Sequence, residues 1–398
     1  MRRNPLLLTL LLPLLFGAPR ATAANRCVLR IGTSGDYPPF SVAADGSYEG
    51  LDVEVVRRLG ADLGCELRFV PFRWPELLPR LTAGEFDVVA SGVTLRWERA
   101  LAARYTRPYA FTGAVAVIPA STAAALASVA DLNRPGLRIA VNGGGHLERV
   151  ARAYFPRATL HTVADNQALQ RALTAHLADA VVTDSAEVQT WRQEDIRLIG
   201  PFTHDAKALL VPAGDAPMAE RLDAWLVARE ADGWLPQLRA RWLRAAPGLD
   251  ATRVARSAAA ALIQLRLTLM PSVAAAKRAA GLPITDAGQE ARVYARVRAL
   301  ATHAPEHAVA VYGELIDMAK AVERHDSAGE SAAKLIDLRD AISRVDEQLV
   351  RELERLPQSS PQQWLEALND FVTVAGVDSS MRANLAQALA GQLPAPCE

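Results

Sequence analysis

The chain has 398 residues, with 44 basic and 44 acidic side chains, and half of its residues are hydrophobic. At roughly 100–200 residues per domain, this length predicts two or three folded units. The balanced charge and the lack of a basic motif argue against a nucleic-acid partner. We therefore expect small-molecule ligands.

The first 23 residues have the pattern of a secretory signal peptide. Arg2 and Arg3 precede an apolar run at 6–16, and small residues follow at 21–23. This order predicts export to the periplasm and cleavage after Ala23, with an uncleaved anchor as the alternative. The run is shorter than the roughly 20 residues that span a bilayer, and we expect no later segment to be long enough.

The cysteines become informative once export is expected. Cys27 and Cys65 each begin a strand-like run, and an oxidising compartment favours a disulfide between them. Two buried free thiols are the alternative, and Cys397 is left unpaired. No cysteine or histidine spacing is typical of a metal site, so we expect neither metal nor cofactor.

The chain divides into two halves of different secondary structure. From about residue 28 to 242, strand-like and helical runs alternate, which predicts an α/β fold with largely parallel sheets. Beyond Trp242 the patterns are helical to the end, with breaks near 281–283, 303–305, 326–329 and 357–361. The breaker cluster at 246–250 predicts the junction.

Several motifs in the first half resemble those of type 3 periplasmic solute-binding proteins. They are GDYPPF at 35–40, YEGLD at 48–52, FDVV at 86–89 and SGVT at 91–94, followed by Arg99 and Tyr109. The resemblance covers about 28–245. It implies two α/β lobes around a ligand cleft, with the second lobe at about 118–208. It also implies that Thr94 and Arg99 bind the ligand, since a guanidinium suits a planar carboxylate.

Two further motifs resemble a catalytic branch, the periplasmic cyclohexadienyl dehydratases. They are VNGGG at 141–145 and TDSAE at 183–187. Asn142 could hold a ring hydroxyl or a carboxylate, and the backbone around Gly144 could cradle a carboxylate at a helix N-terminus. The alternative for the glycines is an ordinary strand-to-helix turn.

The resemblance implies that Glu187 is the general acid of this branch. A carboxyl buried in a closed cleft has a raised pKa and stays protonated near neutral pH. The alternative is structural, because Asp184 and Glu187 also have the spacing of a helix capping box. Asp184 is expected in the substrate site, and this is compatible with an enzyme and with a binding protein.

Three more residues of this half are singled out by the resemblance. Lys207 would pair with a substrate carboxylate, or else be a surface lysine, and Trp74 would form the cleft wall or pack between the lobes. His146 stands where the family usually has a small hydroxyl residue, which is a departure.

In the second half, charged residues interrupt apolar helical stripes. Arg266, Glu323 and Arg339 all lie where the stripe should continue, and such charges are costly in a core unless they are paired or bind a ligand. Lys277 lies eleven residues after Arg266, on nearly the same face about 16 Å along, and Pro271 should kink the helix between them.

These positions resemble the secreted all-helical chorismate mutases over about 253–390, most clearly in VAAAKRAAGLPITD at 273–286. The resemblance implies that Arg266 and Arg339 bind carboxylates, and that Lys277 and a protonated Glu323 contact the breaking ether oxygen. It assigns the substrate hydroxyl to Glu290. The chain departs from the family at two positions. It has Gln289 where the family commonly has an arginine, and Ala319 where the family can have a hydroxyl residue.

Together these resemblances predict a two-domain exported enzyme of phenylalanine biosynthesis. A dehydratase domain at 24–245 would convert prephenate to phenylpyruvate, and a helical domain at 250–398 would convert chorismate to prephenate. Arogenate as a further substrate is left open, and a homo-oligomer is compatible with the sequence. The alternative is a periplasmic amino-acid-binding protein fused to a helical oligomerisation module.

Overall fold

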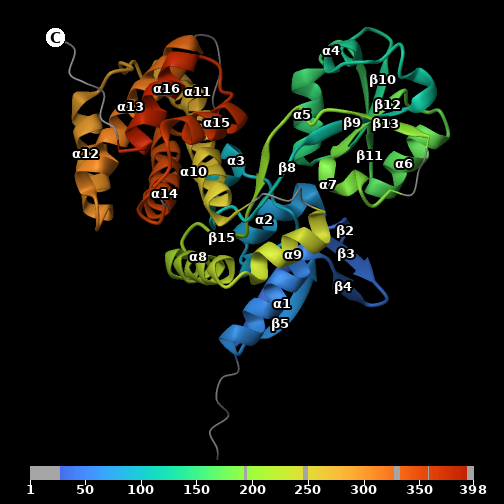
Figure 1. The fold of residues 1–398 in the computed structure, drawn as a ribbon, viewed down its shortest axis with the longest axis horizontal. Coiled ribbons are helices and arrows are strands. Elements are labelled where there is room, and N and C mark those ends of the chain that lie inside the picture. Colours follow the sequence, from blue (N-terminus) through green and yellow to red (C-terminus); the bar gives the residue numbers. More distant parts are fainter. Residues whose placement is uncertain (1–26, 192–194, 245–249, 327–331, 357, 392–398) are drawn as a thin grey trace, which may run out of the picture.

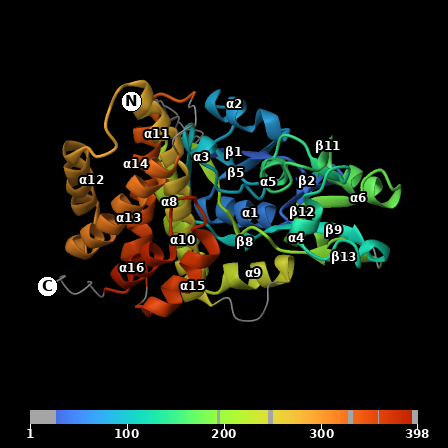
Figure 2. The same ribbon diagram turned by 90° about the horizontal axis from the view of Figure 1, so that it is seen from above.

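The computed structural model describes residues 27–191, 195–244, 250–326, 332–356 and 358–391. The expected signal peptide, most of the expected junction at 246–250, and Cys397 lie outside the described residues. The described chain forms three bodies: two α/β lobes and a helical half (Figure 1). Seen from above, the helical half and the second lobe lie at opposite ends of the molecule (Figure 2).

Lobe 1 is built on a five-stranded sheet of order β5-β1-β6-β15-β7. Strand β1 pairs in parallel with β5 and with the central strand β6, and β15 runs antiparallel to β6 and β7. The strands are β1 Val28–Thr33, β5 Glu66–Pro71, β6 Val88–Val89, β7 Ala103–Tyr105 and β15 Leu210–Pro212. The helices are α1 Leu51–Leu63, α2 Leu77–Thr82, α3 Trp97–Ala100, α8 Ala216–Ala231 and α9 Trp234–Leu243.

Lobe 2 has a second five-stranded sheet, of order β11-β10-β12-β9-β13. Its strands are β9 Ala114–Pro119, β10 Arg138–Asn142, β11 Thr159–Val163, β12 Ala180–Asp184 and β13 Ile196–Ile199. Its helices are α4 Val129–Leu132, α5 His146–Tyr154, α6 Asn166–Thr174 and α7 Ser185–Val188. The two sheets confirm the α/β expectation for this half. The expectation of largely parallel sheets is wrong, because each sheet has two parallel and two antiparallel pairings.

Short elements join the lobes and edge the cleft. The antiparallel strands β8 and β14 form the crossover between the lobes, and β2, β3 and β4 form a small separate sheet. The bounds are β2 Asp36–Tyr37, β3 Ser41–Ala44, β4 Ser47–Glu49, β8 Ala110–Thr112 and β14 Asp205–Lys207, with 3-10 turns at η1 Trp74–Glu76 and η2 Ala120–Thr122.

The second half is helical throughout its described residues, as expected. Its helices are α10 Ala251–Thr268, α11 Met270–Ala279, α12 Ala287–Leu300, α13 Pro305–His325, α14 Leu335–Glu354, α15 Pro361–Phe371 and α16 Ser379–Leu389. The interruption between α10 and α11 falls just before Pro271, where the missing N–H of proline predicts one.

The expectation that no later segment could span a bilayer is wrong by length and composition. Together α10 and α11, Ala251–Ala279, are long and apolar enough. However, 83% of the qualifying window is buried inside the protein, so the apolar side chains serve as a core. This is the behaviour of a central helix in a bundle.

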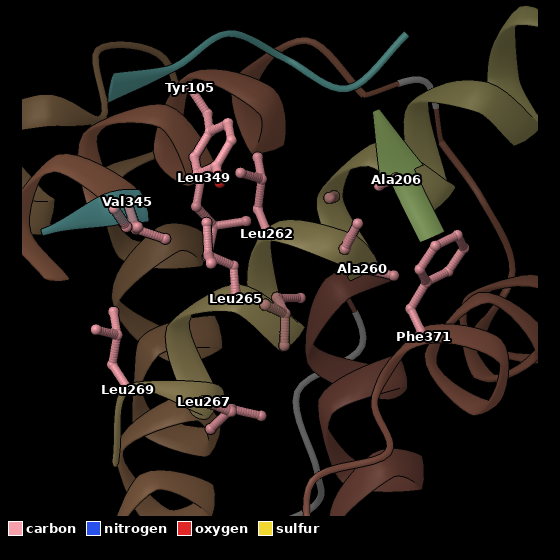
Figure 3. Packing of buried hydrophobic residues seen from close by; sticks show 14 of the residues in the cluster. Tyr105, Ala206, Ala260, Leu262, Leu265, Leu267, Leu269, Val345, Leu349 and Phe371 are labelled. Carbon is pink, nitrogen blue, oxygen red and sulfur yellow. The ribbon is translucent and has the colours of Figure 1, made fainter. Parts of the chain in front are cut away.

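Lobe 1 and the helical half share one apolar core. Figure 3 shows Tyr105 of β7 beside Leu262 of α10 and Leu349 of α14, and Phe371 of α15 near Ala206 of β14. Each face of the lobe 2 sheet has a core of its own. Lobe 1 and the helical half therefore form a common block, with lobe 2 packed separately.

Two ion pairs, one of them buried, reinforce this joint. Arg107 lies 3.2 Å from Glu352 of α14, and Arg104 donates to Glu347 at 2.6 Å. The Arg344 side chain reaches back to the carbonyl of Ala100 at 2.8 Å. The helical half is thus held to lobe 1 by charge as well as by apolar contact.

The expected disulfide is confirmed: Cys27 is bonded to Cys65, 38 residues away, just before the paired strands β1 and β5. Replacing both cysteines with serine should lower the free energy of unfolding by about 3–4 kcal/mol, because the unfolded chain then gains loop entropy. Urea denaturation of the oxidised parent and of the double variant measures the difference. Equal midpoints and slopes would contradict this expectation.

Candidate functional sites

A cleft between the lobes contains four of the residues that the first half was expected to contribute. Its walls come from both lobes and hold Tyr37, Trp74, Gly92, Thr94, Arg99, Asn142, Gly145, His146, Leu147 and Asn166. Trp74, Thr94, Arg99 and Asn142 are thus brought together as predicted. Gly144, Asp184, Glu187 and Lys207 do not line this cleft, although Asp184 and Lys207 both bond to the hydroxyl of its wall residue Tyr37.

Arg99 is the buried cation of the cleft. It lies on the short helix α3, is 4% exposed, and donates through Nη1 to the carbonyl of Thr94 at 2.8 Å. Its guanidinium carbon is 5.6 Å from the ring centroid of Trp74. Burial lowers the pKa of Arg99 to about 10, so it remains charged at neutral pH. It is suited to hold an anion against the tryptophan ring.

Glu187 is 1% exposed and follows the end of β12 on α7. Its Oε2 accepts a hydrogen bond from the hydroxyl of Thr183, and its Oε1 is buried without a hydrogen-bond partner in the described part of the chain. Burial is the main cause that raises the pKa of Glu187 to about 8, and repulsion from Asp184 and Asp36 adds to it. The carboxyl is therefore largely protonated at pH 7.

The capping-box interpretation of Glu187 is wrong in its second part. The Asp184 side chain does cap α7, accepting from the N–H of Ala186 at 2.8 Å. Glu187 instead bonds to Thr183, so it is not the reciprocal partner that a capping box requires.

A buried network connects the two lobes behind the cleft. Oδ2 of Asp184 lies 3.0 Å from Nζ of Lys207 and accepts from the hydroxyls of Tyr37 and Thr112. Lys207 also donates to Thr94 Oγ1 at 2.8 Å. The surface alternative for Lys207 is wrong, since the residue is 1% exposed. Its charge is neutralised by Asp184.

The glycine turn before α5 is shaped by the opposite lobe. Gly144 has φ +77°, and a Cβ there would lie 2.6 Å from Pro75 of lobe 1, so both conformation and space require glycine. Its N–H donates to Glu148 at 2.7 Å, so that group is not free as the cradle interpretation assumed. Asn142 bonds Asn166 at 2.7 Å, and Asn166 in turn reaches the carbonyl of Asp36.

His146 begins α5 and joins the cleft to a larger cavity. Its Nε2 lies 3.0 Å from the buried carboxylate of Asp205 on β14. The larger cavity shares Thr94 and His146 with the cleft and is bounded on its far side by α10 and the end of α15. Part of the helical half therefore borders the approach to the cleft.

A second pocket lies inside the helical half. It contains every residue expected there, together with Asp286, Arg296, Lys320, Ser343 and Asp346, which the sequence analysis did not single out. The expected residues are Arg266, Lys277, Gln289, Glu290, Ala319, Glu323 and Arg339. The pocket is rich in cationic side chains from α10 to α14.

One hydrogen-bond donor of Arg266 lacks an acceptor among the described residues of this pocket. It is 3% exposed, its Nε donates to Oδ1 of Asp346 at 2.8 Å, and its guanidinium lies 5.6 Å from the ring centroid of Tyr312. Its Nη1 is buried without a hydrogen-bond partner in the residues that the structure describes. A buried donor in this state is ready for an anionic ligand, since leaving it unpaired is costly.

Lys277 and Glu323 form an ion pair in the pocket, with Nζ 2.8 Å from Oε2. The lysine also donates to the carbonyl of Ile284 at 2.8 Å. Burial raises the pKa of Glu323, although Lys277 opposes this. The pair offers an ammonium and a readily protonated carboxyl to one ligand atom.

The remaining predicted residues form the rim of the helical pocket. Glu290 lies 3.5 Å from Lys320, and Arg339 lies 3.8 Å from Asp286. The side-chain oxygen of Gln289 accepts from Arg292.

Asp346 could have been found from the sequence. It lies on α14 among Leu338, Ala341, Val345 and Leu349, and so it is a charge on an apolar stripe. The same rule had already selected Arg266 and Arg339.

Two families match the chain. Residues 29–245 match the bacterial extracellular solute-binding proteins of family 3. Residues 257–324 match chorismate mutase type II.

Among curated proteins, a cyclohexadienyl dehydratase of Pseudomonas aeruginosa is 32% identical over 222 residues, covering 54% of this chain and 82% of its own length. The L-cystine-binding protein TcyJ of Escherichia coli is 24% identical over 234 residues, covering 58% of this chain and 86% of its own. An ancestral amino acid-binding protein, described as a precursor of cyclohexadienyl dehydratase, has a TM-score of 0.52 at 31% identity and covers 54% of this chain and 95% of its own.

Proposed function

The chain belongs to the bacterial extracellular solute-binding proteins of family 3, and from that premise we propose that it is an exported enzyme with two activities. The helical half converts chorismate to prephenate, and the cleft converts prephenate to phenylpyruvate. The observation that carries the proposal is Glu187, a buried acid with a raised pKa whose Oε1 has no hydrogen-bond partner among the residues that the structure describes.

The reaction in the cleft needs one well-placed proton. Glu187 protonates the ring hydroxyl of prephenate, which leaves as water while the ring carboxylate leaves as CO2 and the ring becomes aromatic. Arg99 binds the remaining carboxylate against Trp74. Glu187 regains its proton from solvent after product release.

The other cleft residues position the substrate and the acid. Thr94 and Asn142 offer polar contacts, and the turn at Gly144 lets the lobes approach closely. Asp184 is fixed by Lys207, and its negative charge helps to keep Glu187 protonated.

The reaction in the helical pocket is a pericyclic rearrangement, so the protein needs only to hold the compact conformer and stabilise charge on the ether oxygen. Arg266 and Arg339 hold carboxylates of chorismate. Lys277 and protonated Glu323 contact the ether oxygen, Glu290 contacts the substrate hydroxyl, and Gln289 lies at the rim.

A purely amino-acid-binding cleft is disfavoured by its charges. Asp184 already pairs with the Lys207 ammonium 3.0 Å away, so this carboxylate is not free to bind an α-ammonium group. The family supports an extracellular location. Within that, we propose that residues 1–23 are a signal peptide and that the enzyme is periplasmic. We also propose domain bounds of 24–245 and 250–398.

The proposal is tested by incubating the purified chain with chorismate and following the ultraviolet absorbance of phenylpyruvate. Conversion without added enzyme or cofactor is expected. Failure to consume either chorismate or added prephenate would remove the proposed function.

Replacing Glu187 with Gln keeps the side-chain size and an acceptor for Thr183 but removes the acidic proton. The rate on prephenate should fall by about 10²–10⁴-fold, with mutase activity and thermal stability nearly unchanged. Prephenate should accumulate from chorismate in a stopped assay. A rate within a few-fold of the parent would take Glu187 out of the mechanism.

The pH profile gives an independent check on the same group. Because protonated Glu187 is the active form and its pKa is about 8, kcat/KM for prephenate should fall about tenfold per pH unit above 8. Steady-state rates between pH 6 and 10 measure this limb. A flat profile to pH 9.5 would contradict the assignment.

Replacing Arg266 with Ala should abolish conversion of chorismate, because the pocket loses a buried carboxylate-binding group and the buried Asp346 loses the cation that pairs with it. Dehydration of added prephenate should be unchanged. Circular dichroism provides the folding control, and equal loss of both activities in a folded variant would argue against separate sites.

A further inference from the structure

Resting on the proposed mutase function, we infer that Arg296 binds a carboxylate of the dianionic substrate and supplies the cation that Gln289 lacks. Arg296 lies on α12 and lines the helical pocket together with Arg266 and Arg339. Gln289 and Glu290 were the only residues of α12 that the sequence analysis singled out for the substrate site.

The spacing along α12 places Arg296 on the correct face. Seven residues separate it from Gln289, which is nearly two full turns and about 10 Å along the axis. The two side chains therefore project from the same side of the helix, and both line the pocket. The Arg296 guanidinium can therefore reach the part of the pocket that an arginine at position 289 would reach from the N-terminal end of α12.

The pairing of charges leaves Arg296 available. Lys277 is paired with Glu323, Lys320 with Glu290 and Asp317, and the Nε of Arg266 with Asp346. Within the described residues, no carboxylate lies within ion-pair distance of Arg296. The charge of Arg296 is felt inside the pocket. Burial raises the pKa of Asp346, and Arg296 partly offsets this effect.

A hydroxyl holds the Arg296 side chain over the pocket. Its Nη1 donates to Oγ of Ser343 on α14, and Ser343 donates in turn to the carbonyl of Arg339 at 2.8 Å. Arg296 and the Arg339 side chain line the same pocket from two helices, α12 and α14. Two guanidinium groups in one pocket can share one carboxylate, leaving the buried Nη1 of Arg266 for the other.

The test compares Arg296→Gln in the full chain with Arg298→Gln as a matched control. Arg298 is also exposed on α12 but pairs with Glu306, outside the pocket. For chorismate, Arg296→Gln should lower kcat/KM by about 10-fold to 100-fold, mainly through KM, as expected for a lost charge-assisted hydrogen bond. Arg298→Gln should stay within twofold, and dehydration of added prephenate should be unchanged in both.

A second substitution separates a binding role from a structural one. Gln289→Arg in the Arg296→Gln background should recover at least tenfold of the lost kcat/KM, because it returns a guanidinium to the same face. The inference is overturned if Arg296→Gln stays within threefold of the parent, or if Arg298→Gln loses as much activity. A parent chain that does not convert chorismate at all would instead refute the proposed function.

Discussion

The burial of charged side chains controls the chemistry of both sites. Glu187 and Arg266 are almost fully buried, and each keeps one polar atom without a hydrogen-bond partner in the described part of the chain. In a low dielectric such an atom is costly, and a substrate that supplies the missing partner recovers that cost. Desolvation also raises the pKa of Glu187 into the range where it can act as an acid.

The joint between the halves determines which parts can move. Tyr105 and Ala206 belong to the core that lobe 1 shares with the helical half, and the pair Arg107 and Glu352 is buried beside it. Contacts between the lobes include polar pairs, such as Tyr37 with Asp184 and Arg149 with Glu98. Opening of the cleft is therefore expected to move lobe 2 against a block made of the rest.

Sequence reasoning was strongest where a residue conflicts with its local pattern. Arg266, Glu323 and Arg339 were found because charge interrupts an apolar stripe, and Cys27 and Cys65 because export and strand starts coincide. It was weakest where distant segments meet. The pairing of Lys207 with Asp184 and of His146 with Asp205 depends on how the lobes close, which no local pattern encodes.

Glu187 illustrates this limit, since a capping box and a buried acid share the same spacing. Tertiary burial and the hydroxyl of Thr183 decide between them. Gly144 shows the converse, because a turn glycine was expected but the approach of Pro75 from the other lobe was not.

The central claim is that one chain carries two separate active sites, and mixing two inactive variants tests it most directly. Arg266→Ala retains the cleft and Glu187→Gln retains the helical pocket, so an equimolar mixture should convert chorismate to phenylpyruvate although neither variant does so alone. Restored conversion, with prephenate passing through solution, is the predicted result. A mixture that stays inactive because one of the folded variants has lost both reactions would contradict the account.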